Sequence, residues 1–440
     1  MNYTKKIIGI SEGFHDAAIT ILEDNEIVFA TQAERYTRRK NDRWLPEDLI
    51  PSEGTTAYYE NYIAKNSRRI FAGQKIQKTR RKYDRTFSHH QCHAAAGYYT
   101  APFTDCNILV IDSIGEWDTV SIWDNMKKID SWVYPYSLGL LYSAVTQRIG
   151  LKPNEDEYIT MGMAAFGEPI YDLEFLLEQN NHKGCGHIFP NARNEDLAAS
   201  VQQLYEKKLL ELVSMCPKKN LIIMGGCALN CVANSKIHNK NIWIMPNPGD
   251  AGSSLGAAAL VNKKKIKWRD CYLGYDIEKD INPSKVVHHL LNNGVCGVAN
   301  GRAEFGPRAL GNRSLLGDPR KDIKDTVNKI KRRQKFRPFA PAILEEWANY
   351  YFSGPKNEYM QFISRANHDF NAVTHIDGTA RVQVVKKDCN SILRKILEEW
   401  YDKTKCPMLL NTSLNIKGQP IINNELDAVE FEKKYNVKVF

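Results

Sequence analysis

The sequence has no long apolar run. The longest apolar stretches, Leu221–Met224 and Ala257–Val261, are far shorter than the roughly 20 residues that a membrane-spanning helix needs. The first residues, MNYTKKIIGI, enter a strand-like run directly and contain no apolar signal region. We therefore expect a soluble cytoplasmic protein that has no membrane partner.

Two common sequence signatures are also missing. The ten cysteines are scattered and form no CxxC pair, so neither a zinc knuckle nor a disulfide framework is expected. The phosphate-binding pattern GxxxxGK[ST] is absent, which excludes a P-loop enzyme. No repeat or low-complexity tract is visible. What remains is a chain of 440 residues, 43% hydrophobic, which is long enough for two or three domains.

Positive charge is concentrated in one stretch. The net charge is +9, and between Arg35 and Arg85 there are fourteen Lys or Arg residues against six Asp or Glu. The rest of the chain is close to neutral. Such a stretch is either a solvated face or a surface for an anionic partner.

Short β-branched runs that end in polar turns indicate an α/β fold. We expect strands at Lys6–Ser11, Ala17–Leu22, Glu26–Thr31, Asn107–Asp112 and Asn220–Met224, and a helix at Leu138–Ile149. Ligands of such folds bind at the carboxyl ends of strands. The charged run 262–270 is the predicted linker between a domain of residues 1–265 and a domain of residues 266–440.

The run HHQCHA contains the first candidate site. On a helix, His89 and His93 would share one face, and Asp112 and Asp250 follow in acidic turns. Two imidazoles and two carboxylates suit a divalent metal such as Fe(II), Mn(II) or Zn(II), with Fe(II) preferred. The alternative is a set of structural histidines. His15, in the turn after the first strand, is either a general base or a turn residue bonded to its own backbone.

Two further motifs indicate phosphate binding. The glycines of GGCALN, with PGDAGSSLG downstream, would let the backbone approach a nucleotide, although such turns are also common structural punctuation. The segment GRAEFGPRALGNRSLLGDPR contains four arginines, and guanidinium groups bind phosphate and carboxylate in pairs of hydrogen bonds. We expect this segment to bind a small polyanion.

These motifs resemble a known family. The segments SEGFHDAA, HHQCHAA, DSIGEW, GGCALNCVAN, PNPGDAGSSLGAA, EFGPRALGNRS, FRPFAPAIL and LLNTSLN are similar to those of the O-carbamoyltransferases that include nodulation protein U and cephalosporin hydroxymethyl carbamoyltransferase. The resemblance runs nearly end to end. It implies an α/β N-terminal domain of the actin and sugar-kinase type (ASKHA) and a smaller α/β C-terminal domain of the YrdC-like type.

The resemblance also implies a mechanism and the residues that perform it. Carbamoyl phosphate and ATP, with Mg²⁺, would give carbamoyl-adenylate in the C-terminal domain, and the N-terminal domain would pass the carbamoyl group to a hydroxyl. The implied metal ligands are His89, His93, Asp112 and Asp250, and the implied base is His15. The adenylate would be bound by Glu116, Gly225, Gly226 and Asn230. Carbamoyl phosphate and ATP would be bound by Arg302, Arg308, Arg313, Ser314, Arg337, Asn411, Thr412 and Ser413.

The chain departs from the family pattern at Ala303 and Gln334, and the stretch between Asn41 and His89 is short and basic. A trimmed basic lip with several tyrosines suits a large anionic acceptor such as DNA that carries 5-hydroxymethylcytosine, whose base would flip into the site. The alternatives are a small sugar or antibiotic-like acceptor and a catalytically silent nucleotide-binding regulator. A threonylcarbamoyl-type tRNA enzyme is disfavoured by EFGPRALGNRS. A homodimer is also expected.

Overall fold

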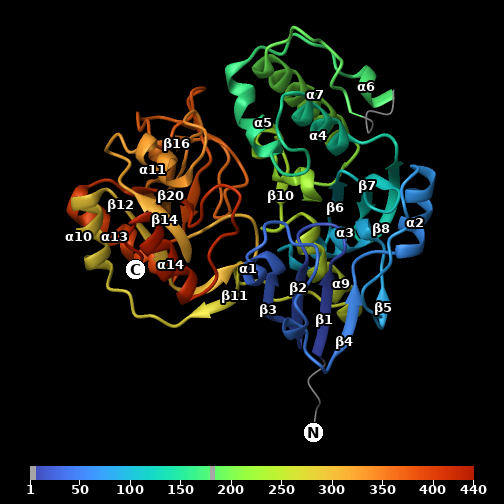
Figure 1. Ribbon diagram of the computed structural model, residues 1–440, viewed down its shortest axis with the longest axis horizontal. Coiled ribbons are helices and arrows are strands. Elements are labelled where there is room, and N and C mark those ends of the chain that lie inside the picture. Colours follow the sequence, from blue (N-terminus) through green and yellow to red (C-terminus); the bar gives the residue numbers. More distant parts are fainter. Residues whose placement is uncertain (1–5, 179–183) are drawn as a thin grey trace. The chain divides into compact units, whose positions relative to one another are not determined.

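The computed structural model describes residues 6–178 and 184–440 (Figure 1). Contacts divide the chain into two units: one contains residues up to Ala30 and Arg43–Arg269, and the other contains Thr31–Asp42 and Asp270–Phe440. Within the described residues, none of the helices combines the length and the apolar character that crossing a membrane requires. All ten cysteines are free thiols.

The first sheet of unit 1 is built around β1 (Lys6–Ser11). This strand pairs antiparallel with β2 (Ala18–Glu23) and parallel with β4 (Thr55–Tyr58). Together with β3 (Glu26–Gln32) and β5 (Arg85–Thr86), the strand order is β3-β2-β1-β4-β5.

The second sheet of unit 1 repeats this topology. Its central strand β6 (Asn107–Ile111) pairs antiparallel with β7 (Asp118–Asp124) and parallel with β9 (Asn220–Met224). Adding β8 (Lys127–Val133) and β10 (Asn241–Trp243) gives the order β8-β7-β6-β9-β10, which matches the first sheet strand for strand. The duplication was not visible as a sequence repeat, because strands need only similar burial and not similar residues.

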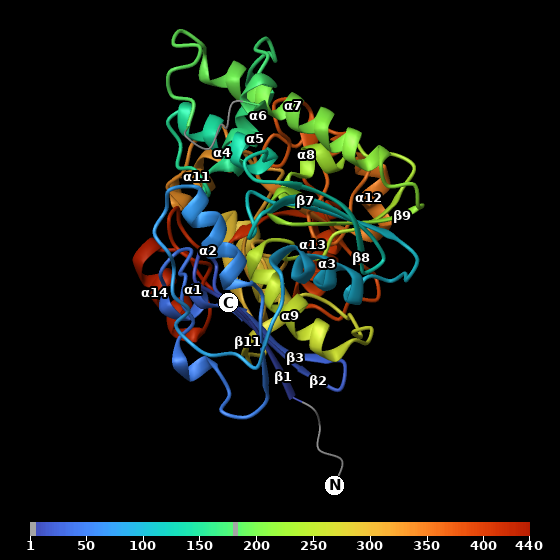
Figure 2. The same cartoon turned by 90° about the vertical axis from the view of Figure 1, so that its right-hand side faces the viewer.

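Two helices pack against each other and against the two sheets. Helix α9 (Ser253–Asn262) packs on the first sheet, α3 (His89–Thr100) packs on the second, and the two helices lie against each other (Figure 2). A Cβ atom at Gly256 would lie 1.8 Å from the carbonyl oxygen of Cys92, and one at Gly9 would lie 1.9 Å from that of Ser254. Glycine is therefore required where α9 meets both α3 and β1.

The remaining helices of unit 1 lie outside the two sheets. They are α2 (Tyr62–Phe71), α4 (Leu138–Arg148), α5 (Glu157–Met163), α6 (Phe175–Glu178), α7 (Asn194–Ser214) and the short α8 (Cys231–Asn234). The predicted strands Lys6–Ser11 and Asn220–Met224 are confirmed to the residue, and the predicted helix from Leu138 ends one residue early.

Unit 2 is a five-stranded sheet with a hydrophobic core on each face. Its order is β12-β14-β20-β15-β19, formed by Val295–Ala299, Arg313–Gly317, Met408–Ser413, Ala340–Leu344 and Gln383–Val385. Side chains alternate across β14: Leu316 joins the core under α10 (Pro283–Asn293) and α13 (Ile392–Thr404), and Leu315 joins the core under α11 (Lys324–Lys331) and α14 (Glu425–Tyr435). The smaller elements are β11 (Tyr272–Ile277), β13 (Gly301–Glu304), α12 (Glu345–Tyr351), β16 (Phe352–Ser353), β17 (Ser364–Ala366) and β18 (Thr379–Ala380). The expected α/β fold class is confirmed in both units.

An N-terminal segment also belongs to unit 2. Helix α1 (Ala33–Thr37) contains Arg35, which is 2% exposed and donates to the carbonyl oxygens of Glu304, Gly306 and Ile422. Within the same segment Glu34 binds Lys40. Arg35 therefore contributes nothing to the basic surface that the charge count suggested.

The helix contact at Gly256 can be tested by one methyl group. In Gly256→Ala the new Cβ meets the backbone of Cys92, so we expect the free energy of unfolding to fall by at least about 2 kcal/mol in chemical denaturation. Gly162→Ala in α5, where nothing lies within 4 Å of the added atom, should change it by less than about 1 kcal/mol. Equal stability of the two variants would contradict the packing described.

Candidate metal centre and anion site

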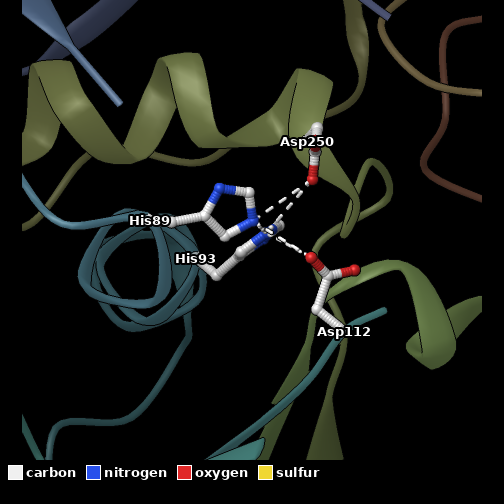
Figure 3. A group of neighbouring side chains, drawn as sticks. All are labelled: His89, His93, Asp112 and Asp250. Carbon is white, nitrogen blue, oxygen red and sulfur yellow. Dashed lines mark hydrogen bonds and ion pairs between the residues drawn. The ribbon is translucent and has the colours of Figure 1, made fainter. Parts of the chain in front are cut away.

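Three elements bring four polar side chains together in unit 1. His89 and His93 lie one turn apart at the start of α3, Asp112 directly follows β6, and Asp250 lies just before α9. Because α3 and α9 meet near their first turns, their N-terminal ends are close. The four side chains point toward one another (Figure 3), as the sequence analysis expected.

The donor atoms converge on a small volume. His89 Nε2 lies 3.0 Å from His93 Nε2, 3.0 Å from Asp112 Oδ2 and 3.4 Å from Asp250 Oδ1. His93 Nε2 lies 3.5 Å from Asp250 Oδ1, and all four atoms are within 4.8 Å of one another. Ligands bound to one ion at about 2.1 Å lie roughly 3.0–3.4 Å apart, so the spacing fits a single divalent metal.

Charge and burial support the same interpretation. All four residues are buried, and two carboxylates without a cation are costly in such a place. Burial lowers the pKa of His89, but the carboxylates of Asp250 and Asp112 outweigh it and raise that pKa well above its usual value. Both Nδ1 atoms are buried and have no hydrogen-bond partner within the described residues. The rings are therefore oriented by packing and by what binds their Nε2 atoms.

Glu116 requires a correction. The sequence analysis assigned it to the adenylate, but its carboxylate accepts hydrogen bonds from the backbone N–H of His89 at 2.9 and 3.1 Å and from that of Asn61 at 2.6 Å. It is 6% exposed. Glu116 thus fixes the first turn of α3, the helix that contains the two histidines. It also fixes Asn61, the residue before α2.

The glycine loop shapes the centre. Gly225 has φ +91°, and a Cβ there would lie 2.1 Å from the carbonyl oxygen of Ile111. The N–H of Gly225 donates to the carbonyl oxygen of Pro248, and the N–H of Gly226 donates to Asp112 Oδ1 at 3.2 Å. Asn230 caps α8 and exchanges two hydrogen bonds with Gln202. These groups bring the loops against Asp112, but the amides of Gly225 and Gly226 are not free to cradle a phosphate.

His15 lies in the loop after β1, half-buried. Its Nδ1 lies 3.0 Å from Asp16 Oδ2, which leaves Nε2 as the nitrogen able to exchange a proton with a ligand. Burial lowers the pKa of His15, but the hydrogen bond to Asp16 and the charges of Asp250 and Asp112 raise it to about 9. An imidazole with this pKa is protonated at neutral pH, and a cation that offsets Asp250 and Asp112 would lower the pKa and make His15 a better base.

In unit 2 the predicted arginines divide into two groups. Arg313 is fully buried, and its guanidinium donates to five backbone carbonyl oxygens, those of Asn423, Asn300, Gly301, Asn312 and Tyr275. Arg302 donates to Leu273 and Gly274 and joins β13 to β11. The assignment of Arg313 to a phosphate is therefore corrected, because all three guanidinium nitrogens donate to buried backbone carbonyl oxygens. Arg308 and Arg337 remain half-buried at the surface of the unit.

The structure adds a lysine that the sequence analysis missed. Lys331, the last residue of α11, is buried and donates to Ser413 Oγ at 3.0 Å and to Asn415 Oδ1 at 2.6 Å. Burial, together with the nearby Arg333 and Arg337, lowers the pKa of Lys331 well below its usual value. Three basic side chains thus lie near the predicted polar cluster. In the sequence Lys331 is one of several lysines in the same run, and no local pattern distinguishes it.

The other predicted polar residues lie on the strands beside Lys331. Ser314 on β14 is paired in register with Ser413 on β20, and Asn411 shares that face, whereas Thr412 points to the other face. The hydroxyl of Ser314 and the amide oxygen of Asn411 are buried without a hydrogen-bond partner among the described residues. Such orphaned groups are rare, and a bound ligand or water is a common reason for them.

Comparison with known proteins identifies the family. Residues 6–52, 49–183 and 176–259 match the carbamoyltransferase N-terminus, and residues 287–440 match the carbamoyltransferase C-terminus. The chain belongs to the carbamoyltransferase family. This assignment makes the protein an enzyme that transfers a carbamoyl group, and it confirms the resemblance noted in the sequence.

Individual relatives span most of the chain. The carbamoyltransferase is 31% identical to an uncharacterized protein of Synechocystis sp. over 96% of this chain and 93% of that protein. It is 28% identical to nodulation protein NolNO of Sinorhizobium fredii over 94% of this chain and 76% of that protein. A ROK family glucokinase from Streptomyces griseus matches 59% of this chain and 99% of its own with a TM-score of 0.30 and 12% identity. The Synechocystis alignment runs over 572 residues, so this 440-residue carbamoyltransferase lacks segments that its relative has.

The metal centre predicts a metal content that single substitutions abolish. In Asp250→Asn or His93→Ala one of four ligands is lost, and bound divalent metal measured by elemental analysis should fall from about one per chain to a trace. His288→Ala, an exposed histidine on α10, is the matched control and should retain the metal. Full metal content in both site variants would contradict the assignment.

Proposed function

We propose that the enzyme is an ATP-dependent O-carbamoyltransferase with an activation site in unit 2 and a transfer site in unit 1. The observation that carries the proposal is the separation of charge. One buried cluster offers imidazoles and carboxylates, which suit a metal, and the other gathers Lys331, Arg333 and Arg337, which suit phosphates. A two-step reaction that uses a phosphorylated donor and ATP requires both kinds of site.

In the activation step, carbamoyl phosphate, ATP and water give carbamoyl-adenylate, pyrophosphate and phosphate. Water cleaves the phosphate from carbamoyl phosphate, and the carbamate oxygen then attacks the α-phosphorus of Mg²⁺-bound ATP, from which pyrophosphate leaves. Arg308, Arg337 and Lys331 would counter the phosphate charges. Ser413, which Lys331 contacts, and Ser314 and Asn411 on the same strand face as Ser413 would supply hydrogen bonds.

In the transfer step, the acceptor hydroxyl attacks the carbonyl carbon, AMP leaves, and the hydroxyl proton passes to His15 Nε2. His89, His93, Asp112 and Asp250 would hold a divalent metal, with Fe(II) preferred and Mn(II) or Zn(II) as alternatives. Such an ion polarises a carbonyl or phosphoryl oxygen. It also offsets the charges of Asp112 and Asp250, which would return the pKa of His15 toward neutrality. Gly226 and the neighbouring loop would line the adenylate.

The activation step predicts exchange of labelled pyrophosphate into ATP that depends on carbamoyl phosphate. Lys331→Gln should reduce this exchange by at least a hundredfold, because the ammonium group that orients Ser413 and Asn415 is lost. Lys329→Gln, two residues earlier and exposed on the same helix, is the control. ATP binding without any exchange in the unaltered enzyme would instead favour a silent nucleotide-binding regulator.

For the acceptor we propose 5-hydroxymethylcytosine in DNA. Lys75, Lys78 and Lys82 are exposed and form no ion pair within the described part of the chain. Close by on α2, Ile63, Ile70 and Phe71 are 68%, 64% and 67% exposed. Exposed cations for phosphates beside apolar side chains for bases are the features of a nucleic-acid surface. The basic surface is nonetheless smaller than the sequence suggested, because Lys65 and Arg68 are buried.

The cysteines fit a reaction inside the cell. Ten free thiols, most of them buried, are typical of a reducing compartment, and we place the reaction in the cytoplasm. A homodimer stays a prediction.

An acceptor screen tests the DNA proposal. Carbamoylation should be detected by mass spectrometry on hydroxymethylated duplex or single strand, and the triple variant Lys75→Gln, Lys78→Gln and Lys82→Gln should show weaker use of the polymer and a salt dependence reduced by about one unit of slope per contact. The double variant Lys263→Gln and Lys264→Gln removes exposed cations elsewhere in the same unit and is the control. Turnover of a small sugar or antibiotic hydroxyl, with no incorporation into either polymer, would contradict the proposal.

A further inference from the structure

The loop between β1 and β2 that contains His15 is short and conformationally demanding. Gly13 has φ +104° and Asp16 has φ +53°, so two of its residues adopt the left-handed region. Glu12, three residues before His15, is 1% exposed. A loop with these properties keeps its shape only where surrounding groups fix it.

Three side chains from the shortened basic segment grip this loop. Arg81 Nη1 donates to both carboxylate oxygens of Glu12, at 2.6 and 2.5 Å, and Tyr83 OH donates to Glu12 Oε1 at 2.7 Å. Gln77 Nε2 donates to the carbonyl oxygen of Gly13. We call residues 77–83 the clasp.

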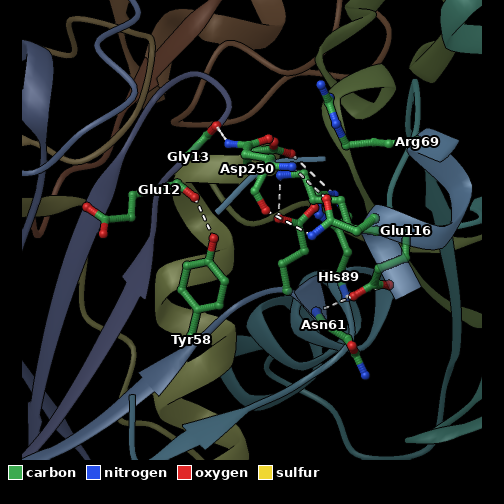
Figure 4. A network of polar contacts seen from close by, with 12 residues as sticks. Glu12, Gly13, Tyr58, Asn61, Arg69, His89, Glu116 and Asp250 are labelled. Carbon is green, nitrogen blue, oxygen red and sulfur yellow. Dashed lines mark hydrogen bonds and ion pairs between the residues drawn. The ribbon is translucent and has the colours of Figure 1, made fainter. Parts of the chain in front are cut away.

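Tyr58 also contacts Glu12, and Arg81 has a further contact with the loop at Leu45. Tyr58 OH on β4 donates to the backbone oxygen of Glu12 at 2.7 Å (Figure 4), and its ring stacks on Tyr83 with centroids 4.3 Å apart and planes 7° apart. Arg81 Nη2 also donates to the carbonyl oxygen of Leu45 at 3.0 Å. Among the described residues, the buried carboxylate of Glu12 forms its ion pair with Arg81.

The other end of the clasp is tied to the helix that adjoins the metal centre. Asn66 on α2 exchanges two hydrogen bonds with the backbone of Gln77, at 2.9 and 2.8 Å. The residue before α2, Asn61, is held by Glu116, the same carboxylate that fixes the start of α3 (Figure 4). Hydrogen bonds thus run from the first turn of the histidine helix, through α2 and the clasp, to the loop that contains His15.

We propose that the clasp positions His15 for the transfer step and that Arg81 is its principal positioning residue. The inference rests on the proposed role of His15 in an O-carbamoyltransferase. Arg81 touches neither the donor nor the acceptor. It neutralises Glu12, whose buried carboxylate would be costly without a cation beside it, and so holds the backbone on which His15 lies.

The proposal separates the two half-reactions. In Arg81→Gln the loop is released, and a displacement of about 1 Å at a catalytic group costs on the order of a hundredfold in rate. We expect kcat for transfer to fall ten- to a hundredfold, while exchange of pyrophosphate into ATP and the metal content stay within twofold of the unaltered enzyme. Arg80→Gln, whose arginine pairs with Glu47 on the surface, is the control and should change neither reaction.

Two further variants protect the test against a folding defect. Arg81→Lys retains the charge but cannot bind Glu12, Leu45 and Glu47 at the same time, so it should lie between Arg81→Gln and the unaltered enzyme. Glu12→Gln combined with Arg81→Gln removes the unpaired charge and should recover at least part of the transfer rate, which general destabilisation by the first change would not allow.

A readout without activity distinguishes this inference from the proposed function. Hydrogen exchange of the peptide covering residues 12–17, followed by mass spectrometry, should be at least tenfold faster in Arg81→Gln than in the unaltered enzyme and unchanged in Arg80→Gln. Equal protection in Arg81→Gln would overturn the clasp whatever the enzyme transfers. Faster exchange in an enzyme that transfers no carbamoyl group would support the clasp and overturn the proposed function.

Discussion

The close contact between α3 and α9 is the constraint on which the transfer site depends. Each helix covers one of two sheets of identical topology, and they meet where Gly256 faces the backbone of Cys92. A contact so close to the start of both helices brings His89 and His93 to Asp250, and the end of β6 adds Asp112. The candidate metal centre is thus a consequence of helix packing, since no single loop contains its four side chains.

The two units contain clusters of opposite charge. The cluster in unit 1 contains two buried carboxylates, which raise the pKa of His89 well above its usual value and, together with the hydrogen bond from His15 to Asp16, raise the pKa of His15 to about 9. Unit 2 has the opposite problem: Lys331 is buried beside Arg333 and Arg337, and an anion would relieve their repulsion. In the proposed reaction each site would be completed by a ligand of opposite charge, a metal ion in unit 1 and phosphates in unit 2.

The sequence predicted that His89, His93, Asp112 and Asp250 converge, because most of that signal is local. Helical spacing places His89 and His93 on one face, and strand-terminal acids such as Asp112 point into the site in an α/β fold. Residue type alone did not distinguish a ligand-binding side chain from a structural one. Arg313 and Glu116 both bind backbone groups that lie elsewhere in the chain. Lys331 was missed for the same reason, since its role depends on a contact with Ser413, eighty-two positions away. The duplicated sheets left no repeat in the residues.

The central claim is that activation and transfer are separate reactions at separate sites of one chain. It is tested most directly by the products of an enzyme with a disabled transfer site. Incubated with ATP and carbamoyl phosphate, a His15→Ala variant should form carbamoyl-adenylate, seen by mass spectrometry after rapid quenching, at the rate of the unaltered enzyme, yet carbamoylate no acceptor. Loss of adenylate formation together with transfer in a folded His15→Ala protein would contradict the account.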